Sequence, residues 1–370
     1  MAASFTQVIL DWYARNGRDL PWRRERTPYA IWLCEIIMQQ TRIAQGTEYW
    51  QRFLQTYPRV DDLAAASEDE VLRLWEGLGY YSRARNLHAA ARQIVAQGGF
   101  PTTLEGIKAL KGVGDYTAAA IGSIAFGLPA AVVDGNVYRV LARYFGISTP
   151  VGTAAAKKEF TSLAQSLLPP ERPGDFNEAM MDFGALQCTP TSPNCVQCPL
   201  GNTCVAFREA RVDALPVKKE GPAVQERFLT YIYIRCNGMT AIRRRPAGDI
   251  WQGLWEPFLI ESSSVTPSSG EPSVPSPGER PVPSAGNPFP GGPAFPDWTG
   301  QGHLTLLRRG QKHQLTHRTL HADFYLFEAP SRPPLSKDYI WIQETELDRY
   351  AKPRLIERLL EVLRVNAIPR

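Results

Sequence analysis

Four of the six cysteines fall within one short stretch of the chain, CTPTSPNCVQCPLGNTC. Cys188, Cys195, Cys198 and Cys204 have the spacing C-x6-C-x2-C-x5-C. Four thiolates gathered in one loop can hold a zinc ion or an iron–sulfur cluster. Zinc sites usually pair two short knuckles across a longer gap, whereas this stretch has one short pair. The spacing over 188–204 therefore favours a 4Fe–4S cluster, with zinc as the alternative.

Two carboxylic acids stand in contexts that suit opposite protonation states. Glu35 lies in IWLCEIIMQQT, where apolar neighbours would raise its pKa and suit it to donating a proton. A surface Glu on an amphipathic helix is the alternative, and the local context alone favours it. Asp134 precedes the helical pattern NVYRVLAR, where it would cap the helix and stay ionised.

The stretch LKGVGDYTAAA predicts a tight turn that opens a helix of small residues. Gly112 and Gly114 allow close approach, and the amides at the helix start can bind a phosphate group. A nucleotide-binding P-loop is excluded, because the Gly-Lys-Ser/Thr ending that such a loop needs is missing. An ordinary turn between two helices is the alternative.

Helices are expected to position these residues. Residues 69–99 show apolar side chains at helical spacing, with Gly98 and Gly99 as a stop signal. The pattern recurs over 136–146 and 177–186. Residues 1–207 are therefore expected to form a mainly α-helical domain.

The pattern changes in the second part of the chain. Residues 228–236, 321–329 and 337–342 are rich in aromatic and β-branched residues, which predicts strands. RLIERLLEVLRV, near the end, predicts an amphipathic helix. Residues 227–370 are thus expected to form an α+β domain with a largely antiparallel sheet.

Two segments are expected to lie outside these domains. Residues 208–226 are charged and contain prolines, as interdomain linkers often are. Residues 261–300 are dominated by Ser, Pro and Gly, which predicts a disordered insertion. The alternative for this insertion is a docking segment that uses Phe289, Phe295 and Trp298.

The overall composition is that of an ordinary globular protein. The net charge is +4, and the excess of basic residues lies beyond residue 210, so composition gives little reason to expect nucleic-acid binding. No run of about 18 apolar residues suggests a membrane span, and the first residues lack the apolar core of a signal peptide. A cytoplasmic protein is therefore expected.

The combination of motifs resembles a known family. LPWR, LCEIIMQQT, GLGYYSRARNLH, LKGVG, VDGNVYRVLAR and FNEAMMDFGALQC precede the cysteine stretch. Together they resemble the helix-hairpin-helix DNA glycosylases with an iron–sulfur loop and, among these, the adenine DNA glycosylases (MutY family), which remove adenine mispaired with 8-oxoguanine. The resemblance implies a helix-hairpin-helix over about 105–125, one 4Fe–4S cluster, and a monomer that acts on duplex DNA containing A opposite 8-oxoguanine or G.

The resemblance also implies a mechanism. Glu35 would protonate adenine at N7, and ionised Asp134 would stabilise the positively charged sugar. Bifunctional relatives carry a nucleophilic lysine where this chain has Tyr116, and a tyrosine cannot form a Schiff base. A monofunctional glycosylase is therefore predicted, in which Tyr116 and Asn136 orient the sugar and the acidic groups.

Further site residues are carried over from the family by matching motifs. Because adenine must be flipped out of the duplex, side chains must fill the gap that it leaves. The predicted wedge residues are Gln40, Thr41, Leu78 and Tyr80, and the predicted adenine pocket consists of Trp22, Arg23 and Glu178. Leu78 and Tyr80 could instead belong to a helix core, and Arg83 and Arg85 could contact phosphates or face solvent.

The second domain resembles a Nudix fold without the acidic motif that binds catalytic metal, which predicts recognition without hydrolysis. The family detects 8-oxoguanine with a Phe-Ser-His loop, and HQLTHRTLH places Leu315, Thr316 and His317 there. His313 and His321 are rivals for His317. The alternatives to an adenine glycosylase are a pyrimidine- or thymine-directed glycosylase of the same superfamily and a non-catalytic iron–sulfur DNA-binding protein.

Overall fold

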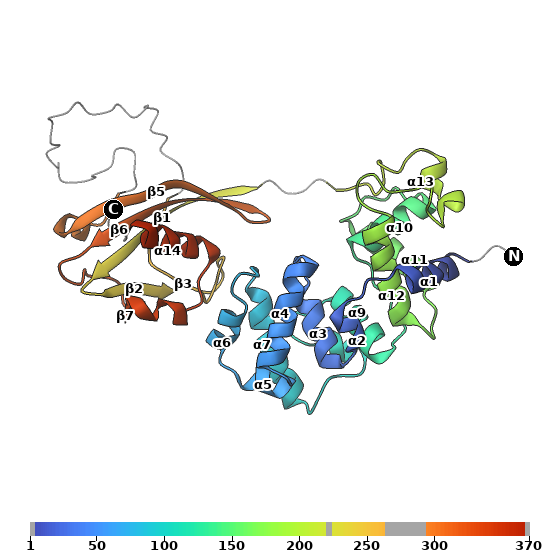
Figure 1. Ribbon diagram of the computed structural model, residues 1–370, viewed down its shortest axis with the longest axis horizontal. Helices are drawn as coiled ribbons and strands as arrows, with labels where there is room; N and C mark the ends of the chain where they lie inside the picture. Colours follow the sequence, from blue (N-terminus) through green and yellow to red (C-terminus); the bar gives the residue numbers. More distant parts are fainter. Residues whose placement is uncertain (1–3, 220–223, 263–293, 367–370) are drawn as a thin grey trace. The chain divides into compact units, whose positions relative to one another are not determined.

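The computed structural model describes residues 4–219, 224–262 and 294–366, and these residues divide into two compact units (Figure 1). The helical unit comprises Met1–Val71 and Arg83–Gly221. The sheet unit comprises Leu72–Ser82 and Pro222–Arg370. The predicted combination of a mainly α-helical domain and a Nudix-like α+β domain is confirmed.

Short helices joined by tight turns build the helical unit, and α6 crosses from it into the sheet unit. They are α1 (Phe5–Asn16), α2 (Pro21–Arg24), α3 (Pro28–Ile37), α4 (Ile43–Thr56), α5 (Val60–Ala65), α6 (Glu68–Leu74), α7 (Ser82–Ala96), α8 (Leu104–Lys108), α9 (Asp115–Phe126), α10 (Gly135–Phe145), α11 (Ala154–Leu167), α12 (Pro173–Asp182) and α13 (Val205–Arg208), with a π-helix η1 (Phe183–Gln187) and a 3-10 turn η2 (Gly201–Thr203).

Side-chain caps fix where several of these helices begin. The side chains of Thr27, Thr103 and Asp134 accept hydrogen bonds from backbone amides in the first turns of α3, α8 and α10. Gly146 ends α10 in the left-handed conformation that glycine adopts without strain. The start of α10, which matters for the site, is therefore set by Asp134 itself.

Helix α3 is apolar on almost every side and is largely buried, packing against α4 and α9. A separate core gathers α1, α10, α11 and α12, which lie together at one end of the helical unit (Figure 1). The largest fully buried side chains of this core are Phe160, Phe176 and Phe183.

The single helix suggested by the pattern over 69–99 is interrupted. Helix α6 ends at Leu74 and α7 begins at Ser82. Between them Gly77, Gly79 and Tyr80 have positive φ angles of 97°, 70° and 48°, which an α-helix cannot accommodate. Residues 72–82 group with the sheet unit in the structure, whereas the domain predicted over 1–207 includes them.

The sheet unit contains one mixed sheet with strand order β3-β2-β1-β6-β5, in which β4 also pairs with β1 and β7 with β2. The central β1–β6 pair is parallel and the other pairs are antiparallel, as largely predicted. The strands are β1 (Gln225–Cys236), β2 (Met239–Arg244), β3 (Trp255–Glu256), β4 (Phe258–Ser262), β5 (His303–Gln314), β6 (Arg318–Glu328) and β7 (Tyr339–Gln343).

Both faces of this sheet are covered by apolar side chains. Helix α14 (Arg354–Asn366) packs on one face, where Leu355 and Leu359 meet Tyr231 and Phe324. Alternate residues of the same strands form a second cluster on the other face, which includes Trp298. The 3-10 turns η3 (Asp297–Gln301) and η4 (Glu344–Arg349) complete the unit.

The two segments predicted to lie outside the domains are partly ordered. Residues 208–219 pack on the helical unit, with Leu215 buried and Val151 paired with Lys218, so the linker predicted over 208–226 is wrong there. In the predicted insertion 261–300, β4 continues to Ser262 and Trp298 is buried beside Phe258, so disorder is wrong at both ends. Residues 263–293, including Phe289, lie outside the described residues.

In the part of the chain that the structure describes, every helix is too short or too polar to cross a membrane.

Candidate active site

Glu35 lies near the C-terminal end of α3, on a helix whose other side chains are almost all buried. The residue keeps some exposed surface, but its carboxyl group is enclosed by protein. The pKa of Glu35 is raised to about 7, chiefly by burial and then by the nearby carboxylates of Glu178 and Asp134, whereas a hydrogen bond with Tyr116 lowers it. The structure thus places a carboxyl group that is half-protonated near neutral pH beside other acidic groups.

Asp134 caps the first turn of α10, as predicted. Its Oδ1 accepts from the Val137 amide at 2.7 Å, and its Oδ2 accepts from Asn136 Nδ2 at 2.7 Å. Arg139 in turn donates to Asn136 Oδ1 at 2.8 Å and to the Cys188 carbonyl at 2.7 Å. The carboxylate is therefore held in one orientation, with its negative charge favoured by the helix N-terminus.

Tyr116 lies in the first turn of α9, close to both carboxyl groups. Burial raises the pKa of Tyr116 well above its usual value, and the charges of Glu35 and Asp134 add to this effect. Its hydroxyl also lies 3.7 Å from the Met181 sulfur. The structure brings Glu35, Tyr116, Asp134 and Asn136 together from α3, α9 and α10.

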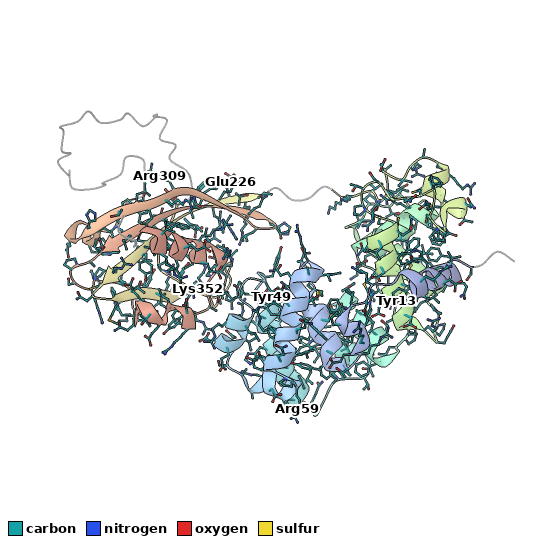
Figure 2. All side chains as sticks on the ribbon, viewed as in Figure 1. Tyr13, Tyr49, Arg59, Glu226, Arg309 and Lys352 are labelled. Carbon is teal, nitrogen blue, oxygen red and sulfur yellow. The ribbon has the colours of Figure 1, made fainter. Side chains whose placement is uncertain are left out.

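A network of arginines and acids flanks this group. Glu178 on α12 accepts from Arg26 Nη2 at 2.6 Å and from the hydroxyl of Tyr13 (labelled in Figure 2) at 3.2 Å. Arg23 donates to Asp182, one turn further along α12, at 2.7 and 2.8 Å. Although burial opposes it, hydrogen bonds from arginines hold the pKa of Asp182 below its usual value.

Arg23 and Glu178, both predicted to line the adenine pocket, are thus partners in this network, with Arg23 Nε 3.6 Å from Glu178 Oε1. Trp22 is buried against Trp50, with ring centroids 5.9 Å apart. Sequence reasoning missed Arg26 and Asp182. The spacing of four between Glu178 and Asp182, together with the arginines of LPWRRER, was the available signal.

The loop after α3 carries two predicted wedge residues. Gln40 is exposed and has a positive φ of 58°, and the Thr41 hydroxyl lies 3.3 Å from the Gln39 carbonyl. Arg83 is buried and donates to the carbonyls of Ile36 and Ile37 at 3.0 and 2.9 Å. Arg83 therefore caps α3, and its interpretation as a phosphate contact or a solvated residue is wrong.

The predicted hairpin connects α8 to α9. Gly112 has a φ of +78°, and an added Cβ would lie 2.6 Å from Asn86 Cβ, so a larger residue would be strained there. Gly114 is the N-cap of α9, and a Cβ added there would meet no other atom within 4 Å. Lys111 fixes the hairpin to α7 because its amide donates to Gln93 Oε1 at 2.7 Å.

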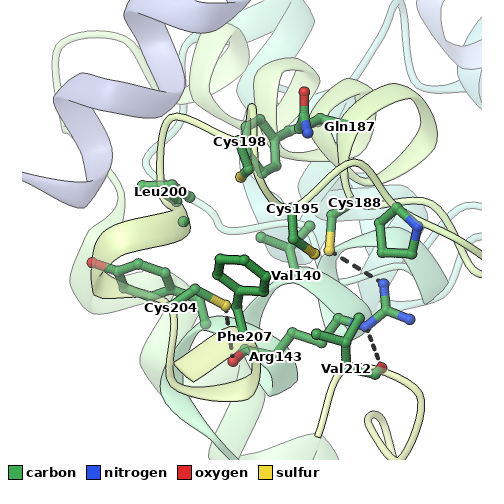
Figure 3. Close-up of a pocket in the computed structure, with 14 residues that line it drawn as sticks. Val140, Arg143, Gln187, Cys188, Cys195, Cys198, Leu200, Cys204, Phe207 and Val212 are labelled. Atoms are coloured by element: carbon green, nitrogen blue, oxygen red, sulfur yellow. Dashed lines mark hydrogen bonds between the residues drawn. The ribbon is translucent and has the colours of Figure 1, made fainter. Parts of the chain in front are cut away.

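All four clustered cysteines line one pocket (Figure 3). Apolar side chains complete its wall, among them Val140, Leu200 and Phe207. Arg143 borders the pocket: its Nη1 lies 3.5 Å from Cys188 Sγ, and its carbonyl accepts from Cys204 Sγ at 3.4 Å. Sequence reasoning missed Arg143, which also donates to the carbonyls of four residues, Val212, Leu215, Thr189 and Pro190.

The donor set of this pocket consists of four thiols. Within residues 4–219, 224–262 and 294–366, no three Cys, His, Asp or Glu side chains converge closely enough to hold one metal ion. Four thiols spread around an apolar pocket are the ligands that an iron–sulfur cluster requires. Burial raises the pKa of the Cys198 thiol to about 11, so binding must supply the positive charge that stabilises a thiolate.

In the sheet unit, the predicted recognition loop is the short turn between β5 and β6. His317 is exposed, and its carbonyl accepts from the Gln225 amide at 3.0 Å. Leu315 packs against the cluster beneath α14. The two rival histidines pack against other aromatic rings. His313 lies near Trp251, and the ring of His321 stacks on that of Phe228 with centroids 5.0 Å apart.

The turn at residues 75–81 carries the other predicted wedge residues. Tyr80 is 47% exposed, whereas Leu78 is buried. The Tyr80 and Thr316 hydroxyls form a hydrogen bond within the sheet unit. This contact joins a predicted wedge residue to the predicted recognition loop.

Two family models match the chain. One, described as the HhH-GPD superfamily of base excision DNA repair proteins, matches residues 33–170, and one described as a NUDIX domain matches residues 230–362. A thermostable thymine-DNA glycosylase of known structure is 32% identical, with a TM-score of 0.51, over 55% of this chain and 95% of that chain.

Three individual proteins that are similar to this chain are all adenine DNA glycosylases. The adenine DNA glycosylase of Homo sapiens is 44% identical over 57% of this chain and 41% of that protein, and the one from Mus musculus is 42% identical over 60% and 45%. The chain thus spans less than half the length of these mammalian relatives. The adenine DNA glycosylase of Buchnera aphidicola subsp. Acyrthosiphon pisum (strain APS) is 35% identical over 68% of this chain and 73% of its own length. On this extent of similarity, the chain belongs to the adenine DNA glycosylase family.

Proposed function

We propose that this chain is a monofunctional DNA glycosylase that removes adenine paired with 8-oxoguanine or guanine in duplex DNA. One observation carries the proposal: Glu35, with a pKa raised to about 7, lies within the electrostatic influence of Asp134, the cap of α10. One group can donate a proton near neutral pH, and the other holds a carboxylate at the N-terminus of α10, where the helix dipole favours a negative charge. Glycoside cleavage by two carboxyl groups requires one that donates a proton and one that is negatively charged.

In the proposed reaction, the flipped adenine accepts the Glu35 proton at N7. The C1′–N9 bond then breaks, and its electrons leave with the neutral base. The Asp134 carboxylate stabilises the cationic sugar until water adds at C1′ and loses a proton. Asn136 donates a hydrogen bond to the Asp134 carboxylate, and Arg139 donates one to Asn136. Together these two bonds keep the carboxylate in place.

Tyr116 supports the monofunctional assignment. A phenol forms no Schiff base with the sugar, so the product would be an intact abasic site. The nearest chain position with a lysine, Lys111, lies in the hairpin turn with its amide bound to α7. Trapping with borohydride should therefore give no covalent adduct.

We further propose that Cys188, Cys195, Cys198 and Cys204 hold one 4Fe–4S cluster, supported by the pocket that they share. When bound, the cluster would crosslink the two ends and the middle of the segment 188–204 and act as a structural clamp for it. Iron analysis should give about four iron atoms per chain. A zinc content of about one per chain, without iron, would contradict this proposal.

Recognition of the opposite base is proposed to use Leu315, Thr316 and His317. The exposed position of His317 and the packing of His313 and His321 support His317 as the residue that meets the lesion. Leucine replaces the family's phenylalanine at 315 and keeps an apolar contact with the core beneath α14. We also propose that the protein acts inside the cell as a monomer, which light scattering of the purified chain would check.

One assay tests the proposed function. Duplexes with A opposite 8-oxoguanine, A opposite G, and T opposite G are incubated with the enzyme and analysed with and without hot alkali. Cleavage of the first two, only after alkali, is the expected result. The similarity to a thymine-DNA glycosylase makes the third duplex the informative alternative, because its preferred cleavage would replace adenine by thymine as the substrate.

A further inference from the structure

The turn at residues 75–81 is held by its own hydrogen bonds. Gly77, Gly79 and Tyr80 all have positive φ angles. The indole of Trp75 donates to the Gly79 carbonyl at 3.0 Å, and this ring is fully buried. The side chains of Leu78 and Tyr80 are therefore placed by this turn and by the contacts that attach it to the rest of the unit.

Its attachment is to the segment before α14, within the sheet unit. The Tyr81 hydroxyl donates to the Lys352 carbonyl at 3.2 Å and accepts from the Gly77 amide at 3.4 Å. The Lys352 amide donates to Glu76 Oε1 at 3.3 Å, and Lys352 Nζ lies 4.0 Å from the same atom. Tyr81 and Lys352 are each only 5% exposed.

Lys352, labelled in Figure 2, is itself fixed on the other side. Its Nζ donates to the carbonyls of Leu347 and Tyr350, both at 2.7 Å, at the end of η4. Tyr81 and Glu76 thus bind the backbone of Lys352, a residue that its own side chain holds in place within the sheet unit. The same unit carries the loop 315–317, and the Tyr80 hydroxyl reaches that loop at Thr316.

We propose that Tyr81 and Glu76 are positioning residues that fix the turn 75–81 to the sheet unit, so that insertion of Tyr80 into DNA and reading of the opposite base by 315–317 occur together. The inference rests on the proposed function. Neither side chain touches DNA in this scheme, and both act on selectivity rather than on bond cleavage. The exposed Tyr80 ring and the Thr316 hydroxyl are the groups that they position.

Tyr81→Phe tests this directly, because the substitution keeps the buried ring and removes only the bridging hydroxyl. The readout is the ratio of single-turnover rates of adenine release from A opposite 8-oxoguanine and from A opposite G. Loss of two hydrogen bonds that fix the turn should lower this ratio about five- to tenfold. The matched control is Tyr138→Phe, a half-buried tyrosine on α10 of the helical unit, whose ratio should equal that of the wild type.

Glu76 provides a second, independent test. Burial raises the pKa of Glu76 to about 7, with Lys352 opposing the effect and Glu357 adding to it. Glu76→Gln keeps an oxygen that can accept from the Lys352 amide and should retain the wild-type ratio. Glu76→Ala should lower the ratio to the level of Tyr81→Phe. Glu361→Ala, which changes an exposed acid on α14 paired with Arg354, is the control.

Three outcomes are decisive. A lowered ratio in Tyr81→Phe and Glu76→Ala, with Glu76→Gln unchanged, supports the proposal. An unchanged ratio in the first two variants, or an equal fall of both rates together with a lower melting temperature, overturns it. If the wild type releases no adenine from either duplex, the proposed function fails and this inference fails with it, a result distinct from an active wild type with insensitive variants.

Discussion

The raised pKa of Glu35 makes the pH dependence of adenine release a strong test of the mechanism. If protonated Glu35 is the acid, the single-turnover rate should be flat below pH 7 and fall about tenfold per pH unit well above it. Replacing Glu178, the largest charged contributor to the shift after burial, should lower the inflection point. Glu178→Gln keeps the shape of the side chain and removes its charge.

The protonated fraction of Glu35 at neutral pH follows from the shift in its pKa. At pH 7, a carboxyl group with the ordinary glutamate pKa of 4.5 is protonated in about one molecule in 300, whereas a pKa of about 7 gives about one half. This shift corresponds to a difference of about 3 kcal/mol between the two protonation states. Because the folded pKa is raised, the contribution of Glu35 to stability is full below pH 4.5 and is lost as the pH rises through 7.

The assay measures adenine release from duplexes with A opposite 8-oxoguanine, with enzyme in excess, between about pH 5.5 and 9, a range that brackets the Glu35 pKa of about 7. The wild type, Glu178→Gln and the control Glu159→Gln, an exposed acid on α11, are compared. An inflection that moves down in Glu178→Gln and stays in place in the control is expected. A rate that rises above pH 7, or a full wild-type rate in Glu35→Gln, would refute the role of Glu35.

Other changes should act at separate points of the molecule. Asp134→Asn should lower adenine release about a thousandfold while DNA binding measured by fluorescence anisotropy stays near wild type, because the sugar cation loses its counter-charge. Arg143→Met removes the donor to buried carbonyls beside the cysteine pocket, so urea unfolding should show a loss of about 3 kcal/mol and iron content should fall. Gly112→Ala should destabilise the hairpin by about 1–3 kcal/mol and weaken binding to matched and mismatched duplexes equally, since its Cβ would clash with Asn86. His317→Ala should lower the preference for 8-oxoguanine over guanine about tenfold in competition assays and leave the melting temperature unchanged.

Features that depend on neighbouring residues were predictable from the sequence. The cysteine spacing indicates one shared site, and all four side chains line one pocket. The position of Asp134 predicts a helix cap, which the residue forms through the Val137 amide. In both cases the chemical signal and its structural partner lie within one short stretch of the chain, so local rules were sufficient.

Features that depend on distant partners were not predictable. Arg143 binds carbonyls of residues some 45 to 70 positions further along the chain, and a helical arginine looks the same in sequence whether it meets solvent or a buried loop. Arg83 has its partners on α3, and its sequence context is equally compatible with a phosphate contact or a solvated residue for the same reason.

One element was assigned wrongly from the sequence, and one strand, β5, was not predicted. The apolar spacing of residues 69–99 continues through GLGYY, yet positive φ angles at the glycines break the helix there. Strand β5 carries Arg308, Arg309 and Lys312 because it is an edge strand, so its pattern lacks the apolar alternation of central strands. The spacing of apolar residues in the sequence indicates which side chains are buried. At turns and at sheet edges, this burial pattern does not determine the backbone conformation.

Because residues 72–82 belong to the sheet unit, the chain cannot be divided into its two units by a single cut. A cut between the two apparent halves of the chain, near residue 221, leaves the 72–82 strip on one fragment and its bonding partners Lys352 and Thr316 on the other. Neither fragment then carries the sheet unit whole. Mixing two separately made halves therefore tests docking of this strip as much as it tests the function of either half.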